Sequence, residues 1–270
     1  MDLSGKVGIV TGSGGEGSGR AEARRLAEAG CRVVVSDINE AGGAETVRLI
    51  HEDGCRADFF RCDAGVSADV QALVAFAEQK FDGLDILINN ASGPYRPGAR
   101  IEQWYDTIQI DLLGAIYGLQ FAVPAMRKRG GGSILNISST SAVGHGRLHS
   151  AAPAYDVAKA GVLRLTTTLA SLRETDNIRV NCLVPDWVAT PEVKSYWDNL
   201  TPEQRQDPHI PAVLISLDEI AQAAFDLVTD PSLAGRVMIF WCGRKPALIP
   251  AADQGYAALE PYERSVSRSA

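Results

Sequence analysis

The sequence predicts an α/β fold built on a doubly wound parallel sheet of about seven strands, with helices on both faces, in a single domain. Three observations lead to this prediction. The 270 residues are enough for one large α/β domain. Short apolar runs rich in β-branched residues alternate with longer helical patterns along almost the whole chain, as βαβ units require. A glycine-rich turn also follows the first apolar run and opens the first helical pattern.

The alternation assigns the elements in order. Strands are predicted at Val7–Thr11, Arg32–Ser36, Asp58–Arg61, Ile86–Asn89, Ser133–Ile137, Arg179–Leu183 and Val237–Trp241. Helices are predicted at Gly19–Ala29, Ala41–Glu52, Ala68–Phe81, Ile101–Arg129, Ala154–Thr175 and Asp218–Thr229. Because no repeat, linker or change of composition interrupts this pattern, residues 1–250 are predicted to form one domain.

Two regions depart from the alternation. Residues 191–211 are rich in proline and include Tyr196 and Trp197. An insertion of this kind over the carboxyl ends of the strands is a candidate lid, although an ordinary surface loop would have the same composition. Residues 251–270 lack periodicity and are predicted to form a C-terminal extension, either a frayed tail or an arm that contacts another subunit.

Charge and cysteine content limit the class of protein. The net charge of -7 argues against a nucleic-acid partner or an anionic membrane surface, although backbone N–H groups can still hold an anionic cofactor. The cysteines are scattered without a C-x-x-C pair, which favours a reducing compartment. No signal-peptide pattern and no apolar run of ~18 residues is found, so we expect a cytoplasmic protein. His145 and His149 fall in a predicted loop, and no metal site is expected.

The glycine-rich turn runs from Thr11 to Gly19, between the first strand and the first helix. Glycines let a backbone turn sharply and approach a pyrophosphate, whose charge is favoured at a helix N-terminus. Asp37 follows at the end of the second strand, where its carboxylate can accept hydrogen bonds from ribose hydroxyls and would repel a 2′-phosphate. This context predicts a Rossmann-like dinucleotide site that prefers NAD to NADP.

A tyrosine and a lysine share one face of a predicted helix. Pro153 suits the first turn of that helix, and Tyr155 and Lys159 stand at i and i+4. A free tyrosine ionises near pH ~10, and a cation one helical turn away favours the phenolate. The pair can therefore serve as a general acid and base, although a Tyr-x-x-x-Lys spacing also arises by chance.

Several motifs occur in the order found in one family. These are Thr11-Gly12 with Gly17 and Gly19, Asp63, Asn89-Asn90-Ala91, Asn136-Ile137-Ser138-Ser139, Tyr155-x-x-x-Lys159, and Asn181 through Thr190. Over roughly residues 3 to 243 the chain resembles the classical short-chain dehydrogenases/reductases. The resemblance implies an NAD-dependent oxidoreductase that interconverts a secondary alcohol and a ketone. It also implies a homodimer or homotetramer, formed through the long fourth and fifth helices.

The resemblance assigns expected roles to individual residues. Gly12, Gly17 and Gly19 would lie along the cofactor, and Asp37 would bind its ribose. Asp63 would lie beside the adenine, and Asn89 and Ala91 would form the turn along the cofactor after the fourth strand. Val188 and Thr190 would lie at the carboxamide end of the cofactor. Tyr155 would transfer the proton. Lys159 would hold the nicotinamide ribose and favour the phenolate. Ser139 would stabilise charge on the reacting oxygen.

The placement of that serine is ambiguous. The position after the strand selects Ser139, but the distance in sequence to Tyr155 fits Ser141 better. We favour Ser139 because strand register fixes the direction of a side chain more firmly than loop length does.

Four positions differ from the family pattern. The glycine loop is one residue longer and contains Glu16, which we expect to point to solvent because it would repel a diphosphate. Ser92 and Asp186 replace glycines, and aspartate tolerates a left-handed backbone better than most residues do. Asp111 replaces an asparagine that holds a water in the family's proton relay. A carboxylate only accepts hydrogen bonds, so we expect an altered relay or slower turnover.

These differences keep a second function open, a non-catalytic NAD-binding or regulatory protein on the same fold. A related epimerase or dehydratase is less favoured, because little chain remains after Pro191 for a larger substrate domain. The predicted pocket walls are Ser92–Arg96, Ser141–Pro153 and Val188–Pro211, which mix aromatic and basic residues. They indicate a medium-sized, partly apolar small-molecule substrate.

Overall fold

A computed structural model of the chain describes residues 1–143 and 151–250. It contains an eight-stranded sheet in the order β3-β2-β1-β4-β5-β6-β7-β8. The first seven strands pair in parallel, and β8 pairs antiparallel with β7. The doubly wound α/β fold in one domain is therefore confirmed. The strand order reverses between β1 and β4, and a ligand crevice is expected at such a reversal, beyond the carboxyl ends of the strands.

The seven predicted strands are all present. Their bounds are β1 Val7–Thr11, β2 Arg32–Asp37, β3 Ala57–Arg61, β4 Ile86–Asn89, β5 Gly132–Ile137, β6 Ile178–Pro185 and β7 Val237–Phe240. The prediction missed β8, Ala247–Leu248, because two exposed residues carry no periodic signal.

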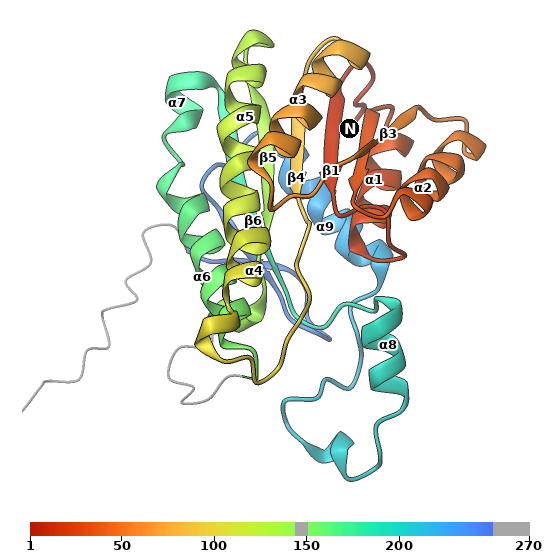
Figure 1. Ribbon diagram of the computed structural model, residues 1–270, viewed down its shortest axis with the longest axis vertical. Coiled ribbons are helices and arrows are strands. Elements are labelled where there is room, and N and C mark those ends of the chain that lie inside the picture. The colour runs from red at the N-terminus through yellow and green to blue at the C-terminus, as the bar shows by residue number, and fades with distance from the viewer. Residues whose placement is uncertain (144–150, 251–270) are drawn as a thin grey trace, which may run out of the picture.

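Helices cover both faces of the sheet. The α-helices are α1 Ser18–Glu28, α2 Glu40–Glu52, α3 Ser67–Phe81, α4 Tyr105–Ile108, α5 Gly114–Lys128, α6 Pro153–Thr168, α7 Leu172–Asp176, α8 Pro191–Asp198 and α9 Leu217–Thr229. Figure 1 shows α3, α5 and α6 in front of the sheet and α9 behind it. Helices α1 and α9 pack on each other on the far face, and α3 packs on α5 on the near face. This arrangement leaves the carboxyl edge of the sheet uncovered by the main helices.

Two predicted helices are divided in the structure. The region predicted as one helix at Ile101–Arg129 consists of a short 3-10 turn, α4, a π-helical turn at Gln109–Leu113, and α5. The region predicted at Ala154–Thr175 ends α6 at Thr168 before α7 begins. Near that end Thr166 and Thr168 donate their hydroxyls to the backbone carbonyls of Val162 and Leu165. Such local side-chain bonds compete with the continuation of a helix.

The core lies on both faces of the sheet. One cluster joins the strands to α1 and α9, and a second joins them to α3 and α5. Strand residues such as Ile9, Val34 and Leu87 are fully buried, as expected for a parallel sheet covered on both faces. The helical run Tyr105–Lys128 is long and apolar enough by composition to cross a membrane. Its residues Leu119, Ala122 and Met126 are nevertheless part of the second cluster.

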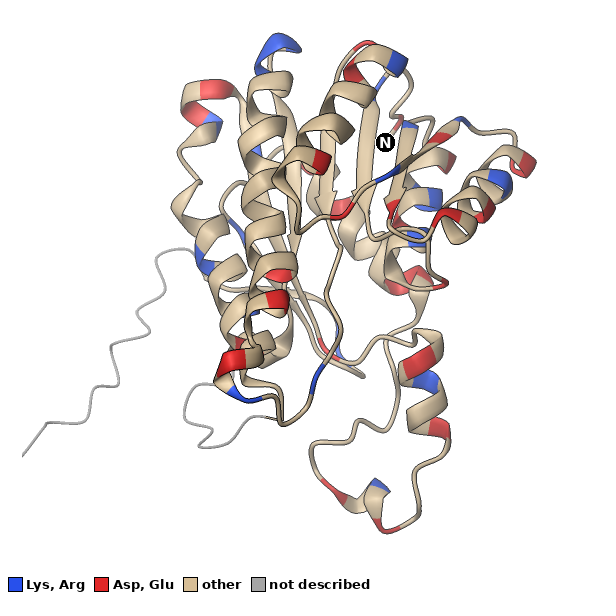
Figure 2. Cartoon of the chain, in the orientation of Figure 1, with Lys and Arg blue, Asp and Glu red and all other residues tan. Residues whose placement is uncertain are grey.

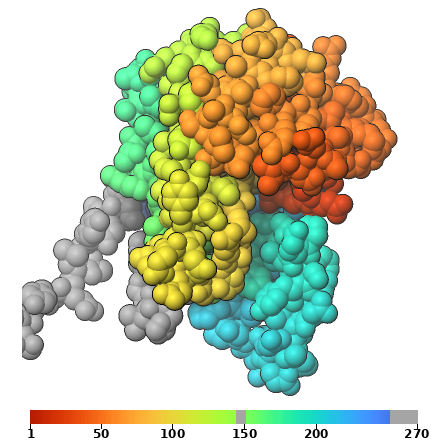
Figure 3. Space-filling view, in the orientation of Figure 1, coloured from red at the N-terminus to blue at the C-terminus, as the bar shows by residue number. Residues whose placement is uncertain are grey.

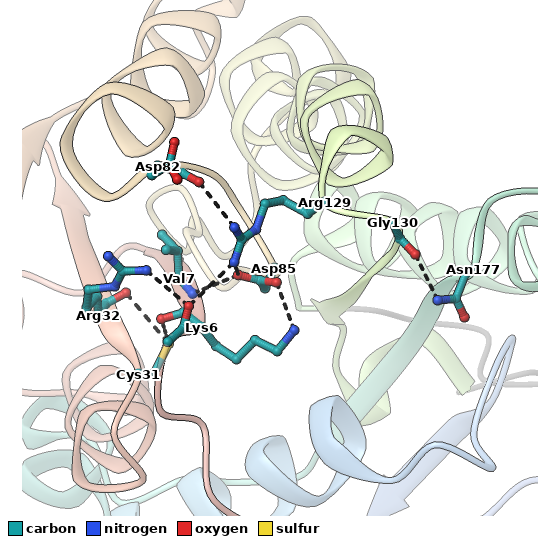
Figure 4. Close-up of polar contacts among 10 residues, drawn as sticks. Lys6, Val7, Cys31, Arg32, Asp82, Asp85, Arg129, Gly130 and Asn177 are labelled. Atoms are coloured by element: carbon teal, nitrogen blue, oxygen red, sulfur yellow. Dashed lines mark hydrogen bonds and ion pairs between the residues drawn. The ribbon is translucent and has the colours of Figure 1, made fainter.

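The amino ends of the strands are tied together around Asp85 (Figure 4). Its carboxylate is 4% exposed and accepts hydrogen bonds from the Val7 backbone N–H at 3.0 Å and from Lys6 Nζ at 3.0 Å. Arg129 lies 3.3 Å from the same carboxylate. These contacts connect β1, β4 and the turn before β5 at the edge opposite the crevice. Figure 2 shows acidic and basic positions interspersed elsewhere along the helices.

Candidate active site

The carboxyl edge of the sheet gathers most of the residues singled out by the sequence. Asp37 ends β2 and Asn89 ends β4, while Ser139 follows β5 and Val188 follows β6. The glycine loop between β1 and α1 reaches the same edge. In Figures 1 and 3 the segments near residues 100 and 200 both project beyond this edge, below the N-terminal part of the chain. The predicted site residues from distant parts of the sequence are thus brought together.

Gly12 and Gly19 of the glycine loop are packed too closely to carry side chains. Gly12 has a φ of +66°, and a Cβ added there would lie 2.7 Å from the Cα of Ala91. A Cβ on Gly19 would lie 2.3 Å from the Gly12 carbonyl oxygen. A Cβ on Gly17 would lie 3.5 Å from Cγ2 of Thr190, so the loop also reaches the segment after β6. The glycines leave backbone N–H groups accessible at the start of α1, which is the cradle that a pyrophosphate requires.

Asp37 is held in place by backbone donors. Its Oδ2 accepts the Gly14 N–H at 2.8 Å, and its Oδ1 accepts the Asn39 N–H at 2.9 Å. The longer loop is braced by Arg20, which donates to the Gly14 carbonyl at 3.0 Å and to Thr46 Oγ1 at 2.9 Å. Glu16 is 76% exposed, which confirms that its side chain points to solvent. The extra residue therefore leaves Asp37 fixed at the end of β2.

The turn after β4 is held by hydrogen bonds to β1 and β5. The side chain of Asn89 donates to Asn136 Oδ1 at 2.8 Å inside the sheet, so its amide is committed to the fold. Asn90 instead donates to the carbonyls of Thr11 and Gly12, both at 3.0 Å. Thr11 Oγ1 accepts the N–H groups of Asn90 and Ala91, both at 3.1 Å. The roles of Thr11 and Asn90 were missed, although both stand in quoted motifs and β1 neighbours β4.

The remaining predicted cofactor residues are Asp63, Val188 and Thr190. Asp63 Oδ1 accepts the Gly65 N–H at 2.8 Å, and Asp63 lines a groove of about 240 Å³. Val188 is 9% exposed and pairs with Ile215 in an isolated parallel bridge. Thr190 caps α8 by accepting the Val193 N–H at 3.4 Å.

Tyr155 and Lys159 lie in the first two turns of α6, which begins at Pro153 as predicted. Lys159 Nζ lies 5.4 Å from the centroid of the Tyr155 ring. The Lys159 side chain is 4% exposed and donates to the Ile137 carbonyl at 3.2 Å. The ring of Tyr95 stands edge-on to that of Tyr155, with centroids 5.7 Å apart. The ammonium is thus buried under the tyrosine, whose ring borders the loop after β4.

Asp111 contacts Lys159 directly. Its Oδ1 lies 3.0 Å from Lys159 Nζ, and its side chain is fully buried. The π-helical turn at Gln109–Leu113 presents this carboxylate, which also accepts the Ser92 hydroxyl and the Gly93 N–H. Burial lowers the pKa of Lys159, but the opposing effects of Asp111 and Tyr155 are together larger, and the pKa is raised. We expected an altered proton relay at this position, and the structure has a direct ion pair there.

The two candidate serines lie in one turn. Ser139 Oγ accepts the Ser141 N–H at 3.2 Å. Ser141 Oγ is buried and has no hydrogen-bond partner among the residues described. Asp186 supports this turn, since its carboxylate accepts the Thr140 hydroxyl at 3.2 Å and the Cys242 N–H at 3.3 Å. The φ of Asp186 is not positive, so aspartate replaces the family's glycine there without a left-handed backbone.

The segment 191–211 folds on itself. Trp197 Nε1 donates to the Pro211 carbonyl at 2.9 Å, and the Arg205 guanidinium lies 4.3 Å from the centroid of the Trp197 ring. Trp187 and Tyr196 also pair, with ring centroids 5.9 Å apart. Within residues 1–143 and 151–250, no cluster of three or more potential metal ligands occurs. His145, His149 and the extension 251–270 lie outside the described residues.

Comparisons with known proteins agree with this geometry. A family model described as Enoyl-(Acyl carrier protein) reductase matches residues 14–236. The chain is 36% identical over 239 residues to a 2,5-dichloro-2,5-cyclohexadiene-1,4-diol dehydrogenase of Sphingobium indicum, covering 85% of this chain and 92% of the relative.

Two solved structures have similar folds. A 7α-hydroxysteroid dehydrogenase complexed with NADH and 7-oxo glycochenodeoxycholic acid has a TM-score of 0.79 and 31% identity, covering 88% of this chain and 94% of that one. A single-residue variant of actinorhodin polyketide ketoreductase with NADPH has a TM-score of 0.78 and 29% identity, covering 88% of this chain and 96% of that one.

The fold and the gathered site define a dinucleotide-binding oxidoreductase with a tyrosine and lysine pair. The chain belongs to the short-chain dehydrogenase/reductase family. It is accordingly an oxidoreductase that acts on CH–OH groups of a small-molecule substrate, with NAD(P) as the cofactor typical of the family.

Proposed function

We propose that the protein is an NAD-dependent oxidoreductase that interconverts a secondary alcohol and a ketone, with Tyr155 as the general acid and base. The observation that carries this proposal is the placement of Tyr155 over the buried Lys159 at the carboxyl edge, next to the glycine cradle. A buried cation close to a phenol favours its ionised form. Tyr155 in that form accepts the alcohol proton during oxidation and returns it during reduction.

The residues present fit a nicotinamide dinucleotide. The closely packed glycines leave backbone donors for the pyrophosphate, and Asp37 offers a fixed carboxylate to the ribose. When bound, the nicotinamide would accept or donate the hydride. Asp37 would repel a 2′-phosphate, and the nearby Arg20 is already bound to backbone and Thr46 oxygens. These contacts support NAD over NADP. Asp63, Ala91, Val188 and Thr190 would complete the cofactor site.

Ser139 is proposed to hydrogen-bond the reacting oxygen and stabilise its negative charge. Its hydroxyl accepts the Ser141 N–H, which leaves its own proton available to donate. Ser141 remains the alternative, because its buried oxygen has no partner among the described residues. Loss of turnover in Ser141→Ala together with retained turnover in Ser139→Ala would reverse this assignment.

The substrate is proposed to contain a ring. Aromatic side chains stand on two sides of the site, namely Tyr95 against Tyr155, and Trp187 with Tyr196. Such surfaces favour flat apolar rings by stacking. The similar proteins named for a cyclohexadiene diol and a hydroxysteroid both act on cyclic alcohols, which supports the same class here.

We also propose a substrate lid, an oligomeric state and a cellular location for the enzyme. The segment 191–211 would act as a lid over the substrate. Assembly into a homodimer or homotetramer would cover the exposed apolar side chains of Ile101, Tyr105 and Val157 on the α4 and α6 side. A cytoplasmic location, with no nucleic-acid or membrane partner, fits the net charge of -7.

The test is to incubate the purified protein with NAD or NADP and a panel of cyclic and linear secondary alcohols, following the absorbance of the reduced nicotinamide. We expect turnover with NAD, and faster turnover with cyclic alcohols. NAD binding measured by calorimetry without turnover of any alcohol, or of any ketone with NADH, would contradict the proposal. That outcome would favour a non-catalytic NAD-binding protein.

A further inference from the structure

Two departures from the family pattern touch each other in the structure. Ser92 stands where a glycine was expected and Asp111 where an asparagine was expected, and the Ser92 hydroxyl donates to Asp111 Oδ1 at 2.5 Å. The Gly93 N–H donates to the other carboxylate oxygen at 2.9 Å. Lys159 Nζ lies 3.0 Å from Oδ1. Ser92 and Asp111 lie 19 positions apart, and Lys159 lies further along the chain. The sequence alone therefore did not indicate that the three side chains touch.

We propose that Asp111 is a positioning residue that serves as the direct counter-ion of Lys159, and that Ser92 orients it. The Asp111–Lys159 pair raises the pH range in which the enzyme turns over. The inference rests on the proposed function, because it requires that Lys159 acts on the catalytic Tyr155. It gives the altered relay expected at Asp111 a physical form, a direct ion pair with Lys159.

Burial makes the contact strong. The Lys159 side chain is 4% exposed and that of Asp111 is fully buried, so water screens the pair little. A buried charge requires a partner and hydrogen bonds, and Asp111 has three donors: the Ser92 hydroxyl, the Gly93 N–H and the Lys159 ammonium. An asparagine at position 111 would carry no charge. Its NH₂ group is itself a donor, so it could not accept the hydrogen bonds that one of the two carboxylate oxygens of Asp111 now accepts.

The titratable groups around Lys159 come from three elements. They are Asp111 on the π-helical turn, Tyr155 on α6 and the thiol of Cys182 on β6. Asp111 is the nearest anion, and its negative charge offsets the ammonium as seen from Tyr155. A neutral amide at position 111 would leave the positive charge of Lys159 uncompensated beside the phenol of Tyr155. Replacing Asp111 by a neutral amide should therefore move activity toward lower pH.

The first test is the pH profile of kcat for alcohol oxidation in Asp111→Asn. We expect its acidic limb to move toward lower pH by ~1 unit or more. The control is Asp53→Asn, which removes one charge from an exposed carboxylate paired with Arg24 and should leave the limb in place. An unmoved limb in Asp111→Asn would overturn the proposal.

The second test examines Ser92. Ser92→Ala should move the limb and lower kcat when Asp111 is present, and Ser92→Thr should restore both because it keeps the hydroxyl. In the Asp111→Asn background, Ser92→Ala should leave the limb unchanged. An equal shift in both backgrounds would show that Ser92 does not act through Asp111.

The third test does not depend on activity. Thermal unfolding is measured for Asp111→Asn, Lys159→Met and the double variant. Each single change leaves a buried group without its partner, so the double variant should lose less in Tm than the two losses summed. If Lys159→Met does not fold alone, recovery of folding in the double variant is the same coupling. Additive losses, or no recovery, would contradict the direct pair. Coupling in a protein without turnover would show instead that only the proposed function had failed.

Discussion

At the scale of single residues, one buried carboxyl among the described residues has no hydrogen-bond partner. Glu22 lies on α1 with both carboxylate oxygens buried and without partners among the residues described. Burial raises its pKa from 4.5 to about 8. The folded state therefore holds this proton more tightly than the unfolded chain does. The contribution of Glu22 to stability is most favourable below pH 4.5 and is lost as pH rises toward 8.

This titration predicts a pH-dependent gain on substitution. Glu22→Gln should raise Tm at pH 8, where the penalty reaches at most about 5 kcal/mol, and should give no gain below pH 4.5. Thermal unfolding across that range checks it. Glu28→Gln, on an exposed position of the same helix, is the matched control and should have little effect. An equal gain for Glu22→Gln at both ends of the range would contradict the assignment of a buried acid.

Cofactor choice is also decided by one residue. Asp37→Ser removes the carboxylate that Gly14 and Asn39 hold at the end of β2. The ratio of kcat/KM for NAD to that for NADP should fall by about tenfold or more, because like-charge repulsion of the 2′-phosphate disappears. Steady-state kinetics with both cofactors measure the ratio. If it stays at the wild-type value, Asp37 does not discriminate between them.

At the scale of elements, contacts at the amino ends of the strands stabilise the fold, whereas residues at the carboxyl ends are proposed to bind the cofactor. Asp85→Ala removes the acceptor shared by Lys6, the Val7 N–H and Arg129 at the amino ends. The free energy of unfolding should fall by roughly 2–4 kcal/mol, while NAD affinity stays the same. Asp53→Ala, which breaks the exposed pair with Arg24, should cost only ~1 kcal/mol or less. Denaturant unfolding and NAD titration check both variants; a matching loss of NAD affinity in Asp85→Ala would contradict the division.

The loop after β4 should select the substrate through Tyr95. Tyr95→Ala should lower kcat/KM for a cyclic alcohol by about tenfold while leaving a linear alcohol of equal carbon number nearly unchanged, because only the ring loses its stacking surface. Tyr105→Ala, on an exposed position of α4, is the control. Equal losses for both alcohols would indicate a structural role for Tyr95.

The elements themselves were largely readable from the sequence. Period and composition placed the seven main strands, since most of them are buried and rich in β-branched residues, as β1 and β2 show. The π-helical turn at Gln109–Leu113 was not readable, because it repeats the same apolar pattern as the α-helices beside it. Strand β8 was too short to leave a pattern.

At the scale of the whole molecule, the order of strands explains what the sequence could place in the site. Residues at strand ends, such as Asp37, meet because parallel strands share a carboxyl edge. Contacts between side chains from distant segments could not be read in this way. The Ser92–Asp111–Lys159 contact depends on how the π-helical turn sits over α6, which no local pattern encodes. The commitment of Asn89 to Asn136 likewise depends on the register of β4 with β5.

In the proposed function, Tyr155 over the Lys159 ammonium moves the proton of the substrate alcohol, while the rest of the site binds the cofactor. The most direct measurement is kcat of Tyr155→Phe beside its NAD dissociation constant. Phenylalanine keeps the ring that packs against Tyr95 and removes only the hydroxyl. We expect kcat to fall by about 10²–10⁴-fold with NAD affinity close to wild type. A Tyr155→Phe variant that binds NAD and still turns over at the wild-type rate would contradict the claim.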